Sequence, residues 1–491
     1  MTFEDFLKYS KNYKTIPVYE IITSDLITPV LAYLKIRRNS NNSFLLESVE
    51  SIGQLARYSF IGRNPDQIIS NNGNQLKINS NGNISILNKN IFNYLSENIE
   101  KFNSLKLDSL PNFTGGIVGY LGFENIELIE EVTVANKKDE LNIPDSIFGI
   151  YNTIIAFDHY KHQTIIINNV HLNETSNLKE EYLKAKSEIN ILKIELAKPI
   201  TINSTFSFNI KEENNQQNEF EKIVTNCKKN IYEGDVIQIV PSVRFKATFE
   251  GDLFNVYRAL RIVNPSPYMY YFELTNDIKI VGTSPEDLLR VQNKNATILP
   301  IAGTRKRGKT EAEDQLLETD LLNDKKEIAE HVMLLDLARN DLGRVCELDT
   351  VALTEKMSIH KFSHVMHIVS RVEGILSENQ NCIDALKSSF PAGTVSGAPK
   401  IRAIQLINKY EKTKRNIYAG AIGYIDFRGN LDMCIAIRTF FAKGNKLYWQ
   451  AGAGIVADSI PENEYAECLN KAAALKNALN FAEVINENFS N

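Results

Sequence analysis

Two segments of this chain each carry a pair of glutamates one helical turn apart. Glu327 and Glu330 lie in a helix that we expect over residues 324–342, and Glu464 and Glu467 follow Pro461 in a second helix. Apolar residues occupy nearly every side of the first helix, which predicts that it is buried. A buried, unpaired carboxylate costs several kcal/mol, so these acids need a positive partner. A hard cation bound by oxygens from both helices satisfies them, and Mg²⁺ is the usual ion when a substrate supplies further oxygens. These residues therefore indicate an enzyme that acts on an anionic small molecule.

Each of these acids also has a purely structural interpretation. Asp324 followed by Glu327 resembles a capping box at a helix start, and Glu330 could pair with Arg339. Glu467 has Lys471 four residues later, which is the spacing of a helix-surface ion pair. Ser459-x-x-Glu462 is expected to cap the second helix, which frees Glu464 and Glu467 from that task.

Two glycine-rich stretches suggest contacts between backbone and an anion. Residues 450–457 nearly match the dinucleotide fingerprint, but four residues separate them from the next helix, which argues against nicotinamide binding. Their exposed N–H groups could still hold a carboxylate. Residues 391–400 lack a Gly-Lys-Ser/Thr sequence and are not a P-loop. They predict a Ser/Thr-capped helix beginning near Pro399, and such a terminus favours anions, although a plain capped turn is the alternative.

Three histidines and one glutamate are candidates for metal binding or for acid–base catalysis. His360, His364 and His367 could suggest zinc, but the valines and isoleucines around the last two favour a strand that separates them onto opposite faces. His367 is then either a hydrogen-bonded core residue or a catalytic one. Glu286 follows Gly-Thr-Ser-Pro at an expected strand-to-helix turn. Its structural interpretation is a glutamate that satisfies the helix dipole.

Composition excludes several classes of protein. The 491 residues include 43% hydrophobic and 23% charged side chains, with a net charge of −5, which gives no reason to expect a nucleic-acid partner. We find neither a signal peptide nor an apolar run that could span a membrane. Five scattered cysteines without C-x-x-C spacing indicate reduced thiols. The expected location is the cytoplasm, with no membrane partner.

The order of the expected elements predicts an α+β fold. Short β-type runs such as 43–47 and 163–170 fill the N-terminal part, and from residue 220 onward helices alternate with β-rich segments. Because helices do not alternate strictly with single strands, we expect large, mainly antiparallel sheets with a sandwich-like core flanked by helices. We divide the chain into an N-terminal regulatory and structural half, 1–200, a connection, 201–219, and a catalytic half, 220–480. The connection shows no core-forming pattern.

Many motifs of the chain, in order, resemble those of chorismate-utilising enzymes, and specifically those of the large subunits (component I) of anthranilate synthases. The match runs from about residue 220 to 479 and, more loosely, through 45–48 and 57–62. It includes Asn264-Pro-Ser-Pro-Tyr-Met269, Gly282-Thr-Ser-Pro-Glu286, Pro300-Ile-Ala-Gly-Thr304, Gly393-Thr-Val-Ser-Gly-Ala-Pro-Lys400 and Gln450-Ala-Gly-Ala-Gly454. The resemblance implies the fold of the anthranilate and aminodeoxychorismate synthases.

Two positions distinguish the reactions within this family. Water-using isochorismate and salicylate synthases carry a lysine base where this chain has Gln238, and the para-aminobenzoate branch typically has lysine at the position of Ala302. Ammonia is already nucleophilic as a neutral amine and needs no such base. Both departures favour anthranilate as the product.

The resemblance also implies roles for individual residues. Glu330 and Glu467 would hold Mg²⁺, Glu286 would be the general acid, His367 would assist proton removal from C2, and Thr394 would have a positioning role. Chorismate would be bound by Gly303, Thr304, Tyr418, Arg438, Gly452, Ala453, Gly454 and Lys471. Tryptophan, as a feedback inhibitor, would bind at Ser48, Pro267, Tyr268 and Met269, in a region around 45–62.

The implied reaction converts chorismate and ammonia to anthranilate and pyruvate through 2-amino-2-deoxyisochorismate, the first step of tryptophan biosynthesis. None of the cysteines lies in a Gly-rich nucleophile turn, so a separate glutamine amidotransferase subunit is implied as the source of ammonia. Two alternatives stay open: a para-aminobenzoate-type aminodeoxychorismate synthase, and a non-catalytic regulator that binds chorismate or tryptophan. Against the regulator, a binding protein need not keep acid, base and metal ligands together.

Overall fold

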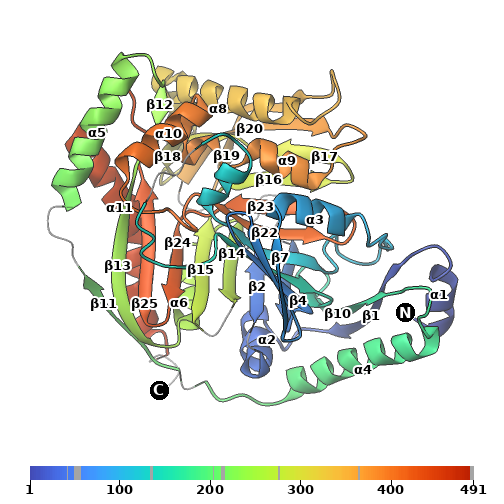
Figure 1. The fold of residues 1–491 in the computed structure, drawn as a ribbon. Coiled ribbons are helices and arrows are strands. Elements are labelled where there is room, and N and C mark those ends of the chain that lie inside the picture. The colour runs from blue at the N-terminus through green and yellow to red at the C-terminus, as the bar shows by residue number, and fades with distance from the viewer. Residues whose placement is uncertain are drawn as a thin grey trace.

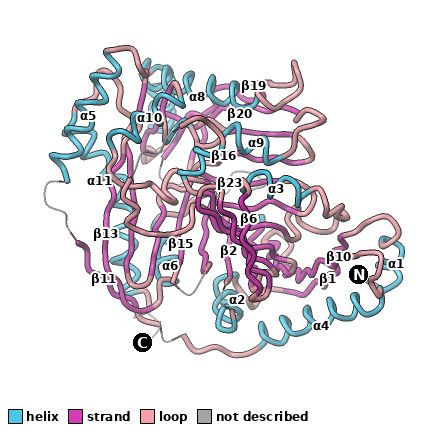
Figure 2. Tube along the Cα trace, in the orientation of Figure 1, coloured by secondary structure: helices cyan, strands magenta, loops and turns pink. Residues whose placement is uncertain are grey.

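The computed structural model describes residues 1–40, 42–48, 57–132, 137–202, 204–211, 216–274, 277–362 and 365–486. Two large, mainly antiparallel sheets form the centre of the molecule, and helices lie on the outside (Figures 1 and 2). The predicted α+β fold with a sandwich-like core is confirmed.

The first sheet has eleven strands. In spatial order they are β1 (Thr15–Thr23), β10 (Gln163–His171), β9 (Thr153–Asp158), β3 (Tyr58–Arg63), β2 (Ser43–Glu47), β14 (Tyr268–Glu273), β15 (Ile278–Ser284), β24 (Thr439–Lys443), β25 (Lys446–Gly452), β13 (Ser242–Gly251) and β11 (Phe206–Lys211).

The second sheet has twelve strands. They are β18 (Ile301–Lys306), β20 (Val365–Ile375), β17 (Asn295–Ile298), β16 (Asp287–Gln292), β23 (Leu431–Ile435), β22 (Ala421–Asp426), β7 (Gly116–Leu121), β8 (Ser146–Tyr151), β4 (Gln67–Asn72), β5 (Gln75–Ser80) and β6 (Asn83–Asn88), with β19 (Ala352–Lys361) paired to β20. A short ladder also joins β12 (Gln238–Ile239) to β21 (Gly397–Ala398).

Three hydrophobic layers hold these sheets and the helices together. Between the sheets, buried aromatic and aliphatic residues from both inner faces interdigitate, among them Phe44 and Phe272 from the first sheet and Tyr120 from the second. The outer face of the first sheet is covered by α1 (Phe3–Tyr9), α2 (Pro29–Ile36), α4 (Leu178–Ala197), α5 (Gln216–Tyr232), α6 (Phe254–Val263), α10 (Lys400–Tyr410) and α11 (Pro461–Val484). The second is covered by α3 (Ile91–Ile99), α8 (Lys325–Gly343) and α9 (Cys382–Ser389), while α7 (Glu311–Asn323) packs beside β18 and β20.

The proposed halves of the chain are interleaved in space. Both sheets contain strands from 1–200 and from 220–480, as where β2 pairs with β14 and β7 pairs with β22. The two halves therefore share their cores and form one composite domain. The predicted connection, 201–219, also contributes to this domain: β11 pairs along the edge of the first sheet, and Phe206 is buried there. Residues 203 and 212–215 of that stretch lie outside the described residues.

Two further features concern the cysteines and the helices. All five cysteines are buried free thiols. Within the described ranges, none of the helices is both long enough and apolar enough to cross a membrane.

Candidate active site

A cavity of about 620 Å³ brings nearly all of the predicted catalytic and substrate-binding residues together. It is bounded by α8, α11, the β18–β20 pair and the loops that carry Glu286 and Thr394. Twelve predicted residues line it: Glu286, Gly303, Thr304, Glu330, His367, Thr394, Tyr418, Arg438, Gly452, Gly454, Glu467 and Lys471.

Four carboxyl groups from two helices face this cavity. Glu327 and Glu330 reach it from α8, and Glu464 and Glu467 reach it from α11. Burial and the neighbouring Glu330 carboxylate raise the pKa of Glu327. Burial, with a contribution from Glu467, likewise raises the pKa of Glu464. Each of the two walls thus presents a pair of neighbouring carboxyl groups to the cavity, with Arg305 near Glu327 and Lys471 paired to Glu467. Carboxylate oxygens of this kind suit a hard divalent ion.

Helix α8 is less buried than its sequence predicted. Its inward side packs through Leu334, Leu335 and Ala338, but Ala329 is exposed and Val332 is 38% exposed. The prediction of burial on every side is wrong because α8 is an outer-layer helix that covers only one face of the second sheet. Glu330 is consequently directed into a cavity rather than into a closed core.

Some of the capping and ion-pair contacts that the sequence offered as alternatives to metal binding are present in the structure. Asp324 caps α8 by accepting hydrogen bonds from the N–H groups of Lys326 and Glu327. Arg339 pairs with Asp336, and no ion pair between described residues includes Glu330. Glu467 does pair with Lys471 at 2.8 Å, but these side chains are 48% and 46% exposed. Such exposed pairs contribute little stability, so the Glu467 carboxylate can change partner at low cost.

Two predicted helix caps are wrong. Helix α11 begins after Ile460 with Pro461 in its first turn and has no side-chain cap, while the Ser459 hydroxyl accepts from the N–H of Val456. Helix α10 begins at Lys400 as predicted, but Pro399 precedes it and supplies no side-chain oxygen. Both starts rely on the fixed backbone angle of proline in place of a hydroxyl acceptor.

Glu286 lies between β15 and β16, so the predicted strand-to-helix turn is in fact a strand-to-strand turn. Burial raises the pKa of Glu286 to about 7, while Thr394, Lys471 and Arg438 act in the opposite direction. The Thr394 hydroxyl oxygen is buried and has no hydrogen-bond partner of good geometry. A carboxyl group that is half protonated near neutral pH can act as a general acid.

His367 is oriented by its neighbours on β18. Its Nδ1 lies 3.0 Å from the Gly303 carbonyl oxygen and 3.0 Å from the Thr304 hydroxyl. Since a carbonyl only accepts, Nδ1 carries the proton and Nε2 is left as the basic nitrogen. The predicted strand over this histidine is confirmed as β20. His360 instead contacts Glu355 at 2.6 Å, and His364 lies outside the described residues.

Gly452 and Gly454, at and just after the end of β25, have no side chain, so their backbone can lie close to the residues around the cavity. A Cβ on Gly452 would lie 2.8 Å from the Tyr418 hydroxyl and from the Pro241 carbonyl oxygen, and one on Gly454 would lie 2.5 Å from Gln238 Nε2. Ala453 differs from these neighbours: its side chain is buried in the core, and its N–H donates to Pro241. Its assignment as a substrate-binding residue is therefore not supported by its position.

Some residues of the cavity were not singled out from the sequence. Asn264 lines it and has a buried amide nitrogen without a hydrogen-bond partner, which makes it a candidate donor to a substrate oxygen. Its position in the Asn-Pro-Ser-Pro motif was the available signal. Lys326 adds positive charge beside the acids of α8. Arg438 has φ of +48°, a conformation that is costly for a non-glycine residue and is concentrated at functional sites.

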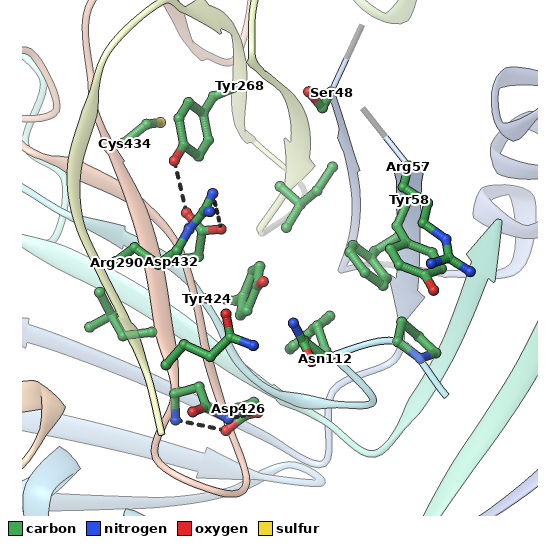
Figure 3. Close-up of a pocket in the computed structure, with 18 of the residues that line it drawn as sticks. Ser48, Arg57, Tyr58, Asn112, Tyr268, Arg290, Tyr424, Asp426, Asp432 and Cys434 are labelled. Atoms are coloured by element: carbon green, nitrogen blue, oxygen red, sulfur yellow. Dashed lines mark hydrogen bonds and ion pairs between the residues drawn. The ribbon is translucent and has the colours of Figure 1, made fainter. Parts of the chain in front are cut away.

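A second cavity, of about 360 Å³, contains the four residues predicted to bind an inhibitor. Ser48, at the end of β2, and Tyr268, at the start of β14, lie at one end of it, and Asp426 lies at the other (Figure 3). The Ser48 hydroxyl is buried without a hydrogen-bond partner, and the Tyr268 hydroxyl donates to Asp432 at 2.9 Å. Pro267 lines both cavities. Of the predicted inhibitor region, residues 49–56 lie outside the described residues.

The chain is similar in sequence and in structure to several known proteins. A family profile described as chorismate binding enzyme matches residues 43–477. Anthranilate synthase component 1 of Acetivibrio thermocellus is 43% identical over 97% of this chain and 98% of its own length, and that of Bacillus subtilis is 42% identical over 97% and 95%. The crystal structure of anthranilate synthase component I from Streptococcus pneumoniae superposes with a TM-score of 0.76, at 38% identity over 93% of this chain and 99% of that one. The menaquinone-specific isochorismate synthase of Escherichia coli, at 18% identity and a TM-score of 0.68, shares the fold.

Proposed function

This chain belongs to the chorismate binding enzyme family, and from that premise we propose that it acts as an anthranilate synthase component 1. It converts chorismate and ammonia to anthranilate, pyruvate and water. The observation that carries this proposal is the single cavity that joins an acid with a raised pKa, an oriented histidine and carboxylates from two helices. Incubation with chorismate and an ammonium salt, followed by chromatographic identification of the product, tests it.

In the first half-reaction ammonia forms a bond to C2 of the ring and the 4-hydroxyl group leaves as water. Glu286 donates the proton that this leaving group requires, because burial keeps a large fraction of its carboxyl group protonated near pH 7. Thr394 faces Glu286 and positions it, since the buried hydroxyl has hydrogen-bonding capacity to spare.

In the second half-reaction the C2–H bond breaks and enolpyruvate departs, taking up a proton to become pyruvate as the ring becomes aromatic. His367 accepts the C2 proton at Nε2, because its Nδ1–H is committed to the Gly303 carbonyl. The carboxylates of chorismate are bound by Arg438, Lys471 and Thr304 and by the backbone near Gly452 and Gly454.

Glu330 and Glu467 are the residues that would hold Mg²⁺. Their donor chemistry fits, since both offer carboxylate oxygens to one cavity from opposite helices. Across the described ranges no group of three or more ligands is arranged to hold a metal. Mg²⁺ usually takes one or two carboxylates from the protein, so substrate and water oxygens would have to complete its coordination here. When bound, the ion polarises the ring carboxylate of chorismate.

Two residue positions distinguish an anthranilate synthase from its nearest rival, a para-aminobenzoate-type aminodeoxychorismate synthase, and from the enzymes of the family that use water. Gln238 and Ala302 both line the cavity, at the positions where lysine would favour water as the nucleophile or the para-aminobenzoate branch. Neither position offers an amine here. A non-catalytic regulator is disfavoured because acid, base and metal-binding residues are all retained around one cavity.

Tryptophan is the proposed ligand of the second cavity. A volume of about 360 Å³ suits an amino acid of this size. Arg290 and Asp432, 3.3 Å apart, provide groups of both signs within its wall, and the free Ser48 hydroxyl provides a further polar contact. Pro267, which lines both cavities, offers a direct route for feedback inhibition.

A glutamine amidotransferase subunit is the proposed source of ammonia. The component 1 designation of the relatives implies a partner component. All five cysteines of this chain are buried, and burial raises the pKa of the Cys227 and Cys468 thiols to about 12, which is unfavourable for a glutaminase nucleophile. The proposed location of the complex is the cytoplasm.

A further inference from the structure

Lys400, at the start of α10, is buried against a carboxylate of another helix. Its Nζ donates to both carboxylate oxygens of Asp341 on α8, each at 2.9 Å. The two side chains are only 10% and 13% exposed. Burial raises the pKa of Asp341, while Lys400 acts in the opposite direction. Because removal of one partner of a buried ion pair is strongly destabilising, this pair constrains the segments that carry it.

The same ammonium group also holds the segment that leads into Thr394. Lys400 Nζ donates to the carbonyl oxygen of Ser389 at 3.3 Å, and Ser389 is the last residue of α9. The last carbonyl groups of a helix lack partners within the helix, and a lysine can satisfy them. One ammonium group thus joins the two ends of a loop, residues 389–400. Thr394 lies midway along this loop.

One face of α8 runs from this ion pair to the catalytic cavity. Four residues follow the spacing i, i+4, i+7 and i+11, which places them on one side of the helix: Glu330, Leu334, Leu337 and Asp341. Glu330 and Leu334 line the catalytic cavity. Leu337 contacts the loop, since a Cβ on Gly393 would lie 2.6 Å from its Cδ1. This face therefore borders the cavity at one end and holds the loop at the other.

Thr394 also lies beside the catalytic acid. Its hydroxyl group approaches the Glu286 carboxyl group and lowers the pKa of that group. The end of the loop beyond Thr394 is fixed by the pairing of β21 with β12. The half from Ser389 to Thr394 is the part whose start Lys400 holds. A shift of this half would move Thr394 relative to Glu286.

We propose that Lys400 and Asp341 are positioning residues, which fix the loop 389–400 against α8 and so hold Thr394 beside Glu286. The inference rests on the proposed function, because it concerns the step in which Glu286 donates a proton. Neither member of the ion pair lines the catalytic cavity. Their effect on turnover is therefore transmitted through the loop.

Substitution of Lys400 tests this inference. Lys400→Met removes the ammonium group and keeps an apolar side chain. Lys387→Met is the matched control, because it breaks a more exposed ion pair, between Lys387 and Asp384 on α9. Steady-state rates are measured with the full chain at saturating Mg²⁺ and ammonium, with chorismate varied. We expect Lys400→Met to lower kcat about tenfold, equivalent to about 1.4 kcal/mol, with the KM for chorismate unchanged, and the control to match the unsubstituted chain.

A double-substitution cycle with Thr394 separates positioning from general damage to the fold. Thr394→Val removes the hydroxyl group that Lys400 is proposed to position. Lys400→Met should therefore lower kcat little further in the Thr394→Val background. Full multiplication of the two effects would show that they are independent, and that result overturns the proposal. An unchanged kcat in a folded Lys400→Met variant also overturns it.

Asp341→Leu combined with Lys400→Met is the second variant if the single substitution does not fold. It removes both charges, and replacement of a complete buried ion pair by apolar residues is often tolerated. The loop still loses its contact at Ser389, so the same fall in kcat is expected, and an unchanged kcat overturns the proposal. If the unsubstituted chain forms no anthranilate from chorismate and ammonium, the proposed function itself fails, whatever the variants show.

Discussion

Arg415 donates to both carboxylate oxygens of Glu411, at 2.9 and 2.7 Å, in a pair that is almost fully buried. The same guanidinium donates to the carbonyl oxygens of Val240 and Val395. Val240 lines the catalytic cavity, and Val395 follows Thr394 in it. This ion pair therefore links two loops that line the catalytic cavity.

Glu411→Gln is expected to destabilise the fold by about 3–5 kcal/mol, because it leaves the Arg415 charge buried without its partner. Urea-induced unfolding, followed by circular dichroism, measures the loss. Asp336→Asn removes the exposed partner of Arg339 and is the matched control, with an expected change of at most about 1 kcal/mol. Equal effects of the two substitutions would show that the buried pair has no special role.

The activity should fall as the pH rises through about 7. Burial raises the pKa of Glu286 from its ordinary value to about 7, so the acid form that donates the proton is lost above that pH. The raised pKa of Glu286 also makes the free energy of unfolding depend on pH. It favours the folded chain at low pH, and this contribution disappears as the pH rises through about 7. The measurement is kcat against pH, with ammonia supplied at saturating concentrations of its neutral form.

Glu286→Gln should lower kcat by about 10²–10⁴-fold, the range that a positioned general acid contributes, and should abolish the limb near pH 7. Persistence of that limb in the variant would assign it to another group.

His367→Ala is expected to stall the second half-reaction. Without a base at Nε2, the C2 proton is removed slowly and 2-amino-2-deoxyisochorismate accumulates. Chromatography of quenched reactions measures the intermediate and anthranilate together. Release of anthranilate at the unsubstituted rate, with no intermediate, would exclude His367 as the base.

Ser48→Ala should weaken inhibition by tryptophan. The Ser48 hydroxyl is buried in the second cavity and lacks a partner until a ligand arrives. Loss of one hydrogen bond, about 0.5–1.5 kcal/mol, should raise the inhibition constant about two- to tenfold. Ser10→Ala, at the end of α1 and away from this cavity, is the control. If the constant is the same in both variants, tryptophan does not contact Ser48.

Local patterns in the chain predicted the fold class, whereas most residues of the catalytic cavity were assigned through the resemblance to anthranilate synthases. Alternating strands such as β2 and β10 lie within a residue of their expected ends, and twelve of the site residues implied by the resemblance line one cavity. Each motif contains a glycine, proline or charged residue whose local requirement is visible in the chain itself.

The errors arose where tertiary context decides the outcome. The apolar residues of α8 suggested burial on all sides, yet its outer side, with Val332, faces solvent. The chain 201–219 looked polar, but sheet pairing recruits Phe206 as an edge-strand residue. The turn after Ser284 leads to a strand because β16 finds partners in β17 and β23.

The product formed from chorismate and an ammonium salt, measured before and after removal of divalent ions, tests the central claim most directly. The account predicts that anthranilate and pyruvate form in equal amounts, that a chelator stops their formation, and that Mg²⁺ restores it. It also predicts that Glu330→Gln and Glu467→Gln each raise the Mg²⁺ concentration required. Formation of a para-aminobenzoate precursor or isochorismate in place of anthranilate, or full activity in the presence of the chelator, would contradict it.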